Sequence, residues 1–182
     1  MVYVFLAPGF EEIEALAVVD VLRRAELDVL TVGVGEDFVI GSHQIPVACD
    51  IAEKSLILDE KTEAIVLPGG MPGTLNLEKS ETVQNAIDWA TKNDKLVCAI
   101  CAAPSILGHK GLLNGKSATC FPGFEEELFG ADISKDYVVK DGSIITARGM
   151  GSAIEFGLQI AEVLTSRENA QKIRASLQIY NG

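Results

Sequence analysis

The sequence is poor in the residues on which metal sites, disulfide scaffolds and disordered segments depend. Only two histidines, four cysteines, six prolines and one tryptophan occur among 182 residues. The two histidines do not have the spacing of metal ligands, so no metal is expected. Four cysteines are too few for a disulfide framework, which indicates reduced thiols. With 48% hydrophobic residues, the chain is expected to form a single domain over residues 1–182.

Long apolar runs and an excess of positive charge are also absent. No stretch reaches the roughly 18 apolar residues needed to cross a bilayer, and residues 1–4 do not form a basic leader. The formal net charge is −11, which disfavours nucleic acid and anionic lipid because like charges repel. These absences predict a cytoplasmic protein that binds neither membranes nor specific nucleic acid.

Short apolar runs alternate along the chain with segments of helical periodicity. A capping box of Ser152 and Glu155 is expected to open the fourth helix, and turn residues predict hairpins over 38–47 and 137–146. This alternation predicts a doubly wound α/β sandwich with a mainly parallel sheet and its site at the carboxyl ends of the strands. The predicted strands are 2–7, 27–32, 64–67 and 96–100, and the predicted helices are 11–25, 80–92, 102–107, 152–164 and 166–179.

Cys101 directly follows a predicted strand and precedes small residues that open a helix. The free N–H groups and dipole of a helix start favour the thiolate, which is the reactive form of cysteine. From position alone, a cysteine that packs as a small apolar residue is an equally good interpretation. Cys98 completes a C-x-x-C pattern with Cys101, but it lies inside the strand, so we expect a core residue and not a redox dithiol. Cys49 and Cys120 carry no local motif and are interpreted as packing or interface residues.

Glu14 lies on the apolar stripe of the first predicted helix. A carboxyl group on this stripe faces the core or a pocket, where burial raises its pKa by disfavouring the charged form. A protonated Glu14 can donate a hydrogen bond to a thiolate, and the two groups then titrate as a coupled pair. Glu11 and Glu12 are explained as first-turn acids that complement the helix dipole. Ile13, on the opposite face, suggests a subunit contact. The stripe consists of Phe10, Glu14, Val18, Val21, Leu22 and Ala25.

Glycines follow two further strand ends. Gly69 and Gly70 indicate either a tight turn or a backbone N–H aimed at a developing oxyanion. The Gly-x-Gly at 149–151 opens a helix and can cradle an anion beside Arg148. It is not a full dinucleotide fingerprint, so no nucleotide cofactor is expected. His109 lies about two helical turns beyond the cysteine, which is too far for it to act as the cysteine's base.

Four sequence blocks in this order resemble the ThiJ/PfpI superfamily, and within it the branch of the Parkinsonism-associated protein deglycase and its small bacterial relatives. The resemblance implies a flavodoxin-like domain that usually dimerises. It also implies that Cys101 is a nucleophile at a strained elbow and that Glu14 is the protonated glutamate beside its sulfur. The blocks are residues 6–14, 66–70, 99–104 and 146–151, the last followed by Glu155-Phe156.

The same resemblance assigns further contacts. Gly70 and Ala102 match the backbone N–H donors of an oxyanion site, and Gly69 and Arg148 lie in matching motifs as substrate-binding residues. The sequence departs from many members at Phe121-Pro122, where a histidine often precedes the proline. The missing imidazole disfavours a Cys-His-acid triad, and with it a peptidase or amidase.

Two functions from different classes follow from this interpretation. The first is a cofactor-independent glyoxalase or deglycase that acts on methylglyoxal-like dicarbonyls or early glycation adducts. In that reaction Cys101 adds to the aldehyde and Glu14 carries the proton between carbons. The second is a redox sensor or chaperone of the oxidative stress response, in which Cys101 is oxidised to a sulfenate or sulfinate. An amidase-like or peptidase-like hydrolase is the third candidate.

Overall fold

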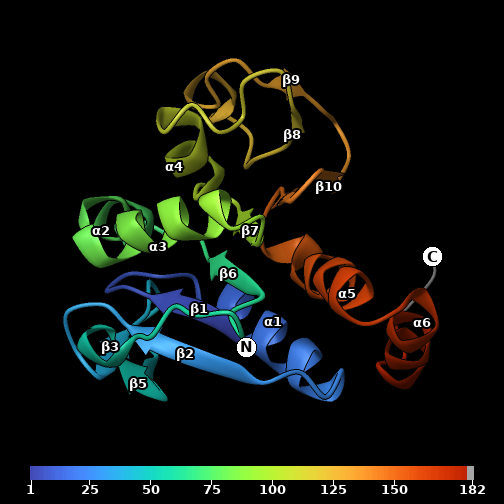
Figure 1. Cartoon of the computed structure of the whole chain (residues 1–182), viewed down its shortest axis with the longest axis horizontal. Coiled ribbons are helices and arrows are strands. Elements are labelled where there is room, and N and C mark those ends of the chain that lie inside the picture. Colours follow the sequence, from blue (N-terminus) through green and yellow to red (C-terminus); the bar gives the residue numbers. More distant parts are fainter. Residues whose placement is uncertain (180–182) are drawn as a thin grey trace.

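Seven strands form the central sheet of the computed structural model, which describes residues 1–179 (Figure 1). They are β1 (Val2–Leu6), β2 (Val29–Gly33), β5 (Ile51–Ala52), β6 (Ala64–Leu67), β7 (Leu96–Ile100), β10 (Val138–Asp141) and β11 (Ile144–Ala147). The order across the sheet is β10-β11-β7-β6-β1-β2-β5. All neighbouring strands are parallel except the β10–β11 pair. The parallel run β2-β1-β6-β7-β11 is the flavodoxin-like order, which confirms the predicted fold class.

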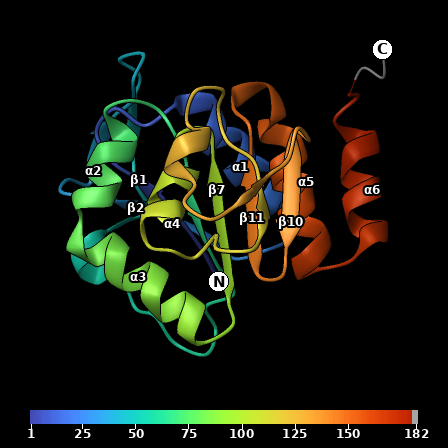
Figure 2. The same ribbon diagram turned by 90° about the horizontal axis from the view of Figure 1, so that it is seen from above.

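Helices cover both faces of the sheet, as the two views show (Figures 1 and 2). Helices α1 (Glu12–Arg24) and α5 (Ala153–Leu164) cover one face, and α6 (Arg167–Ser176) packs against α5. Helices α2 (Gly73–Lys79), α3 (Glu81–Lys92) and α4 (Pro104–His109) cover the other face. Side chains alternate between the two cores along each strand, so that Val4 of β1 packs toward α1 while Phe5 packs toward α3.

The smaller elements lie at the ends and edges of this sandwich. Both predicted hairpins are confirmed, the first as β3 (Phe38–Ile40) with β4 (Pro46–Ala48) and the second as β10 with β11. The sequence patterns did not predict α2, the short pair β8 (Ser117–Ala118) and β9 (Asp132–Ile133), or the single-turn helices η1 (Glu53–Ser55), η2 (Glu125–Glu127) and η3 (Met150–Ser152). Within residues 1–179, no helix has the length and apolar character needed to span a membrane.

Two helix starts differ from the prediction. The helix expected over 102–107 begins only at Pro104, because the chain first turns through Cys101. The capping box at the start of α5 is not formed. The Ser152 hydroxyl donates to the Gly149 carbonyl at 2.8 Å, and Glu155 pairs with Arg174 of α6. The turn η3 therefore leads into α5 in place of a side-chain cap.

Candidate functional site

Cys101 lies at the turn between β7 and α4, where its backbone φ is +65°. A residue with a side chain seldom adopts this left-handed conformation, so the surrounding structure must hold it there. Two hydrogen bonds do so. The Cys101 N–H donates to the Ala147 carbonyl at 2.9 Å, and the Cys101 carbonyl accepts the Phe121 N–H at 2.8 Å. The half-buried thiol thus occupies a fixed position at the carboxyl end of the sheet.

Glu14 reaches the same position from α1, and only 1% of its surface is exposed. Its Oε2 accepts the Gly69 N–H at 2.9 Å. The Cys101 thiol and the Met150 N–H lie close enough to the carboxyl group to affect its pKa. The rest of the predicted stripe is buried as well, which explains why α1 points this carboxyl inward. The structure therefore brings together the acid and the thiol that the sequence singled out.

Gly69 and Gly70, which follow β6, fill the space between these two groups. A Cβ atom on Gly69 would lie 2.6 Å from Cys101 Cβ and 2.7 Å from Glu14 Oε2, so only glycine fits there. Gly70 has a φ of +91°. Its N–H and that of Ala102 both face the Cys101 sulfur. Two convergent N–H donors can stabilise negative charge on the sulfur or on an oxygen bound beside it.

Burial raises the pKa of Glu14 to about 7. The hydrogen bonds from the Cys101 thiol and the Gly69 N–H oppose this rise, and the nearby charge of Glu11 adds to it. The direction agrees with the expectation from the apolar stripe. A carboxyl group with this pKa exchanges its proton readily near neutral pH.

Burial, followed by the negative charge of Glu14, raises the pKa of Cys101 to about 12. The expectation that the helix start lowers this pKa is therefore wrong. Helix α4 begins only at Pro104 and ends at His109, so its dipole is small and displaced from the sulfur. The N–H groups of Ala102 and Gly70 lower the pKa, but by less than burial and the carboxylate raise it. At neutral pH the thiol therefore keeps its proton, which is the reverse of the expected pairing of a protonated Glu14 with a Cys101 thiolate.

Both histidines are engaged away from the Cys101–Glu14 pair. His109 bridges two carboxylates, with Nδ1 2.5 Å from Glu78 Oε1 and Nε2 2.8 Å from Glu127 Oε2. These partners raise the pKa of His109 and tie α2, α4 and η2 together. His43 lies on the first hairpin beside Glu12. Neither imidazole takes the place of the histidine that many superfamily members have at the position of Phe121.

Glu12 has a structural role that the first-turn interpretation missed. It is 2% exposed, and its carboxylate accepts the His43 N–H at 2.8 Å and the Ser42 hydroxyl at 3.2 Å. These bonds attach the β3–β4 hairpin to α1. Glu11, Glu12 and His43 are also the only group of three or more possible metal ligands within residues 1–179 whose ligand atoms lie within 4.8 Å of one another. Because donors of the hairpin already bind the Glu12 oxygens, these three residues are better explained as an anchor for the hairpin than as a cation site.

Arg148 lines a cavity of about 410 Å³, which Phe121, Tyr137 and Met150 also line. A Cβ atom on the next residue, Gly149, would lie 3.8 Å from Glu14 Oε1, so the backbone of Gly149 lies between this cavity and the acid of the Cys101–Glu14 dyad. The Gly149 N–H donates to the Ser152 hydroxyl at 3.3 Å. The glycine loop is therefore not the open anion cradle that its sequence suggested.

The other cysteines do not join the dyad. All four thiols are free. Cys98 is fully buried, as predicted, and burial raises its pKa. Cys120 is 4% exposed and lies near Arg148, whereas Cys49 is half-buried near Gly33. Cys101 is thus the thiol that combines a strained turn, an acid partner and two N–H donors.

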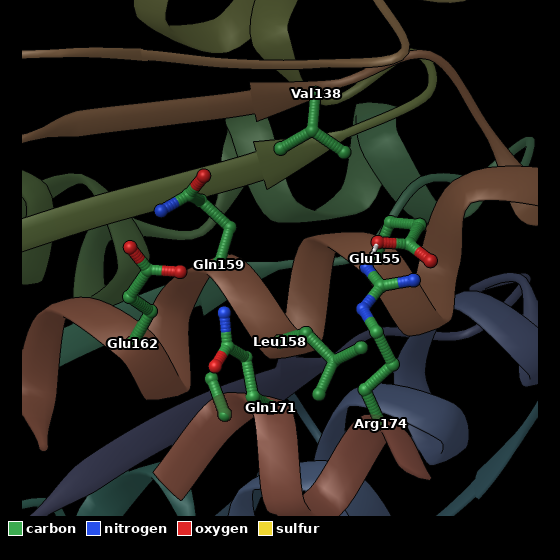
Figure 3. A pocket seen from close by; sticks show the side chains of 8 residues that line it. Val138, Glu155, Leu158, Gln159, Glu162, Gln171 and Arg174 are labelled. Atoms are coloured by element: carbon green, nitrogen blue, oxygen red, sulfur yellow. Dashed lines mark hydrogen bonds and ion pairs between the residues drawn. The ribbon is translucent and has the colours of Figure 1, made fainter. Parts of the chain in front are cut away.

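A separate cavity of about 120 Å³ lies between α5 and α6 (Figure 3). The ion pair of Glu155 with Arg174 forms part of its wall, and Gln159 and Gln171 also line this cavity. None of the predicted site residues lines it. The chemistry-bearing groups are therefore gathered at the carboxyl ends of β6 and β7 and not in this groove.

The model of the DJ-1/PfpI family matches residues 1–163. The chain belongs to the DJ-1/PfpI family. It is 37% identical over 182 residues to protein dj-1beta of Drosophila melanogaster, covering 98% of this chain and 97% of that protein. It is 30% identical over 165 residues to the glutathione-independent glyoxalase DJR-1.2 of Caenorhabditis elegans, covering 90% and 87%.

Solved structures of the DJ-1/PfpI family share the fold over nearly the whole chain. The crystal structure of Drosophila melanogaster DJ-1beta superposes with a TM-score of 0.91 at 35% identity, covering 98% of this chain and 97% of that one. Oxidized Toxoplasma gondii DJ-1 superposes with a TM-score of 0.89 at 34% identity, covering 97% and 96%. These likenesses confirm the family resemblance that the four sequence blocks indicated.

Proposed function

We propose that this DJ-1/PfpI family member is a cofactor-independent enzyme of the glyoxalase or deglycase type. Its substrates are methylglyoxal-like dicarbonyls or early glycation adducts, its nucleophile is Cys101, and its proton shuttle is Glu14. The observation that carries the proposal is that the buried Glu14 carboxyl and the Cys101 thiol lie against the same glycine, Gly69, with two N–H donors facing the sulfur. A relative that is 30% identical carries the name of a glutathione-independent glyoxalase, which supports this reaction class.

The first step forms a hemithioacetal. The Cys101 sulfur attacks the aldehyde carbon, and the Glu14 carboxylate takes the thiol proton as the carbon–sulfur bond forms. A base is needed at this step because the thiol pKa is raised to about 12. The carbonyl oxygen becomes an oxyanion, for which the Gly70 and Ala102 N–H groups are the available donors. Glu14 then passes the thiol proton to this oxyanion, which completes the hemithioacetal and returns Glu14 to the carboxylate form.

The second step moves a hydrogen within the substrate. Glu14 removes the proton from the former aldehyde carbon and returns it to the neighbouring carbon. The hemithioacetal hydroxyl proton passes to the former ketone oxygen, and the product is a thioester. The aldehyde carbon is oxidised and the ketone carbon is reduced, so no external oxidant or reductant is consumed. Water then hydrolyses the thioester, which releases lactate from methylglyoxal and restores the thiol.

Two substitutions test this proposal in a methylglyoxal-consumption assay with lactate detection. Cys101→Ser removes the nucleophile and Glu14→Gln removes the base, and each is expected to lower kcat/KM by at least about 100-fold. Cys98→Ser serves as the matched control, because Cys98 lies in the core. Full activity in both site variants would sink the mechanism.

A redox-sensing role is the second candidate. The same two N–H donors and Glu14 can bind the oxygens of an oxidised Cys101. Mass spectrometry after mild peroxide treatment separates the two roles. A sensor requires Cys101 to oxidise more readily than Cys98 and Cys120, and equal oxidation of the three thiols would exclude it.

We also propose that the chain forms a homodimer through the outer face of α1. Ile13 is 52% exposed and Leu16 is 37% exposed on this helix. The attached hairpin adds Phe38 and Ile40, which are also exposed. Apolar side chains gathered in this way on adjoining elements are typical of a protein interface. Sedimentation analysis tests this association.

A further inference from the structure

Arg148 is a half-buried cation without a carboxylate partner within residues 1–179. Of the other arginines, Arg23, Arg24 and Arg174 form ion pairs. Arg167 forms none within residues 1–179, but it is exposed. The Arg148 guanidinium instead lies 5.4 Å from the centroid of the Tyr137 ring. Stacking of this kind fixes the plane of a guanidinium and leaves its N–H donors free for another acceptor.

A cavity of about 310 Å³ lies against Arg148 near β8 and β9. Lys135 and Glu125 are its other charged lining residues, and Cys120 and Ser134 also face it. The Glu125 carboxylate accepts the Gly123 N–H at 2.7 Å, so one of its hydrogen-bond acceptor positions is already occupied. Two cations against one carboxylate make this cavity positive on a chain of net charge −11. An anion is favoured here and disfavoured over much of the remaining surface.

Two residues next to Arg148 in the chain tie this region to Cys101 and Glu14. Ala147 accepts the Cys101 N–H at 2.9 Å, and a Cβ atom on Gly149 would lie 3.8 Å from Glu14 Oε1. Arg148 itself lines both this cavity and the 410 Å³ cavity. Phe121 lines the second cavity and is bonded through its N–H to the Cys101 carbonyl at 2.8 Å. Arg148 is therefore close in the fold to the residues that surround the thiol.

We propose that Arg148 and Lys135 form a subsite for the carboxylate of a substrate whose dicarbonyl end reaches Cys101. This inference rests on the proposed function and narrows the substrate class to oxoaldehydes that carry a carboxylate on a short carbon chain. The planar guanidinium of Arg148 binds a carboxylate through two parallel hydrogen bonds, and the Lys135 ammonium adds a point charge.

The reaction of 4,5-dioxopentanoate illustrates the chemistry. Its aldehyde forms the hemithioacetal with Cys101, the hydrogen shift gives a 2-hydroxy thioester, and one water releases 2-hydroxyglutarate. The oxidation and the reduction again occur within the substrate. The distant carboxylate takes no part in bond making, so its contribution is binding and orientation.

The test compares this substrate with its uncharged analogue 2-oxopentanal. The wild-type chain is expected to favour 4,5-dioxopentanoate by at least about tenfold in kcat/KM, since hydrogen bonds to charged groups contribute about that much. Arg148→Met is expected to lower this ratio by at least about tenfold, and Arg148→Lys to lower it less. Lys140→Met, at an exposed position of β10, is the matched control for the loss of one positive charge. An unchanged ratio in Arg148→Met overturns the subsite.

A binding measurement separates this inference from the proposed function. Calorimetric titration of the Cys101→Ala variant with 2-hydroxyglutarate needs no turnover. Adding Arg148→Met to that background is expected to raise the dissociation constant by at least about tenfold. If neither aldehyde is consumed but this difference is found, the enzyme proposal fails and the subsite stands. Equal binding with and without Arg148 refutes the subsite.

Discussion

Glu14→Gln should make the protein more stable above neutral pH, because the wild-type fold holds a carboxyl group that resists ionisation. Burial raises the pKa of Glu14 from its ordinary 4.5 to about 7. The folded state therefore binds this proton more tightly than the unfolded state. The wild-type protein loses stability as pH rises from about 4.5 to about 7, and the loss is complete above that range. Glutamine cannot ionise and avoids the loss.

The size of the effect follows from the same pKa. Each factor of ten in a protonation equilibrium corresponds to about 1.4 kcal/mol, so this rise costs the folded state about 3 kcal/mol at pH 8. The amide of glutamine has the same shape, and its oxygen can still accept the Gly69 N–H. The free energy of unfolding of Glu14→Gln should then exceed that of the wild type by about 3 kcal/mol at pH 8 and by little at pH 4.5.

Urea denaturation at the two pH values, in the presence of a reductant, measures this difference. Glu60→Gln, at an exposed position, provides the reference for the removal of one negative charge. A stability difference that is the same at pH 4.5 and pH 8 would refute the assignment of a buried, proton-holding carboxyl. A gain that appears only at high pH would show that the site carries Glu14 at a cost to stability.

Three further predictions concern other parts of the structure. Gly69→Ala places a Cβ 2.6 Å from Cys101 Cβ and should lower kcat/KM by about 100-fold, and an unchanged kcat/KM would contradict the close packing at this site. His109→Gln should lower the Tm at pH 6 but not at pH 9. Because the pKa of His109 is raised, its ion pairs stabilise the fold below pH 6.5 and are lost as pH rises through the raised pKa. An equal loss of Tm at both pH values would contradict this. Ile13→Glu should shift the sedimentation coefficient to that of a monomer, and a coefficient equal to the wild-type value would place the interface elsewhere.

The sequence predicted the central fold well because its signals are local. Continuous apolar runs mark the buried strands, and the helix predicted over 80–92 begins with the cap residue Ser80, whose hydroxyl accepts the Val83 N–H at 3.3 Å. Helix α2 was missed because it is short and opens after Met71-Pro72, without an apolar period. The Ser152 capping box failed because Arg174, from another helix, provides a partner for Glu155. A local pattern cannot foresee such a tertiary contact.

The candidate site was predictable in its residues but not in its electrostatics. Glu14 stood out because a carboxyl interrupts an apolar stripe, and Cys101 because it follows a buried strand. The raised thiol pKa depends on burial and on a carboxylate contributed by a distant helix, which no local pattern encodes. Lys135 was missed for a related reason. It lies on an exposed segment without a motif, and only the fold brings it to the same cavity as Arg148.

The pH dependence of methylglyoxal turnover tests most directly whether Glu14 serves as the base for Cys101. If Glu14 must be ionised to take the thiol proton, kcat/KM should rise about tenfold per pH unit below pH 7 and level off above it, following the pKa of about 7. In Glu14→Gln the residual rate should lose this inflection. A wild-type profile without an inflection near pH 7, or the same inflection in the glutamine variant, would contradict the mechanism.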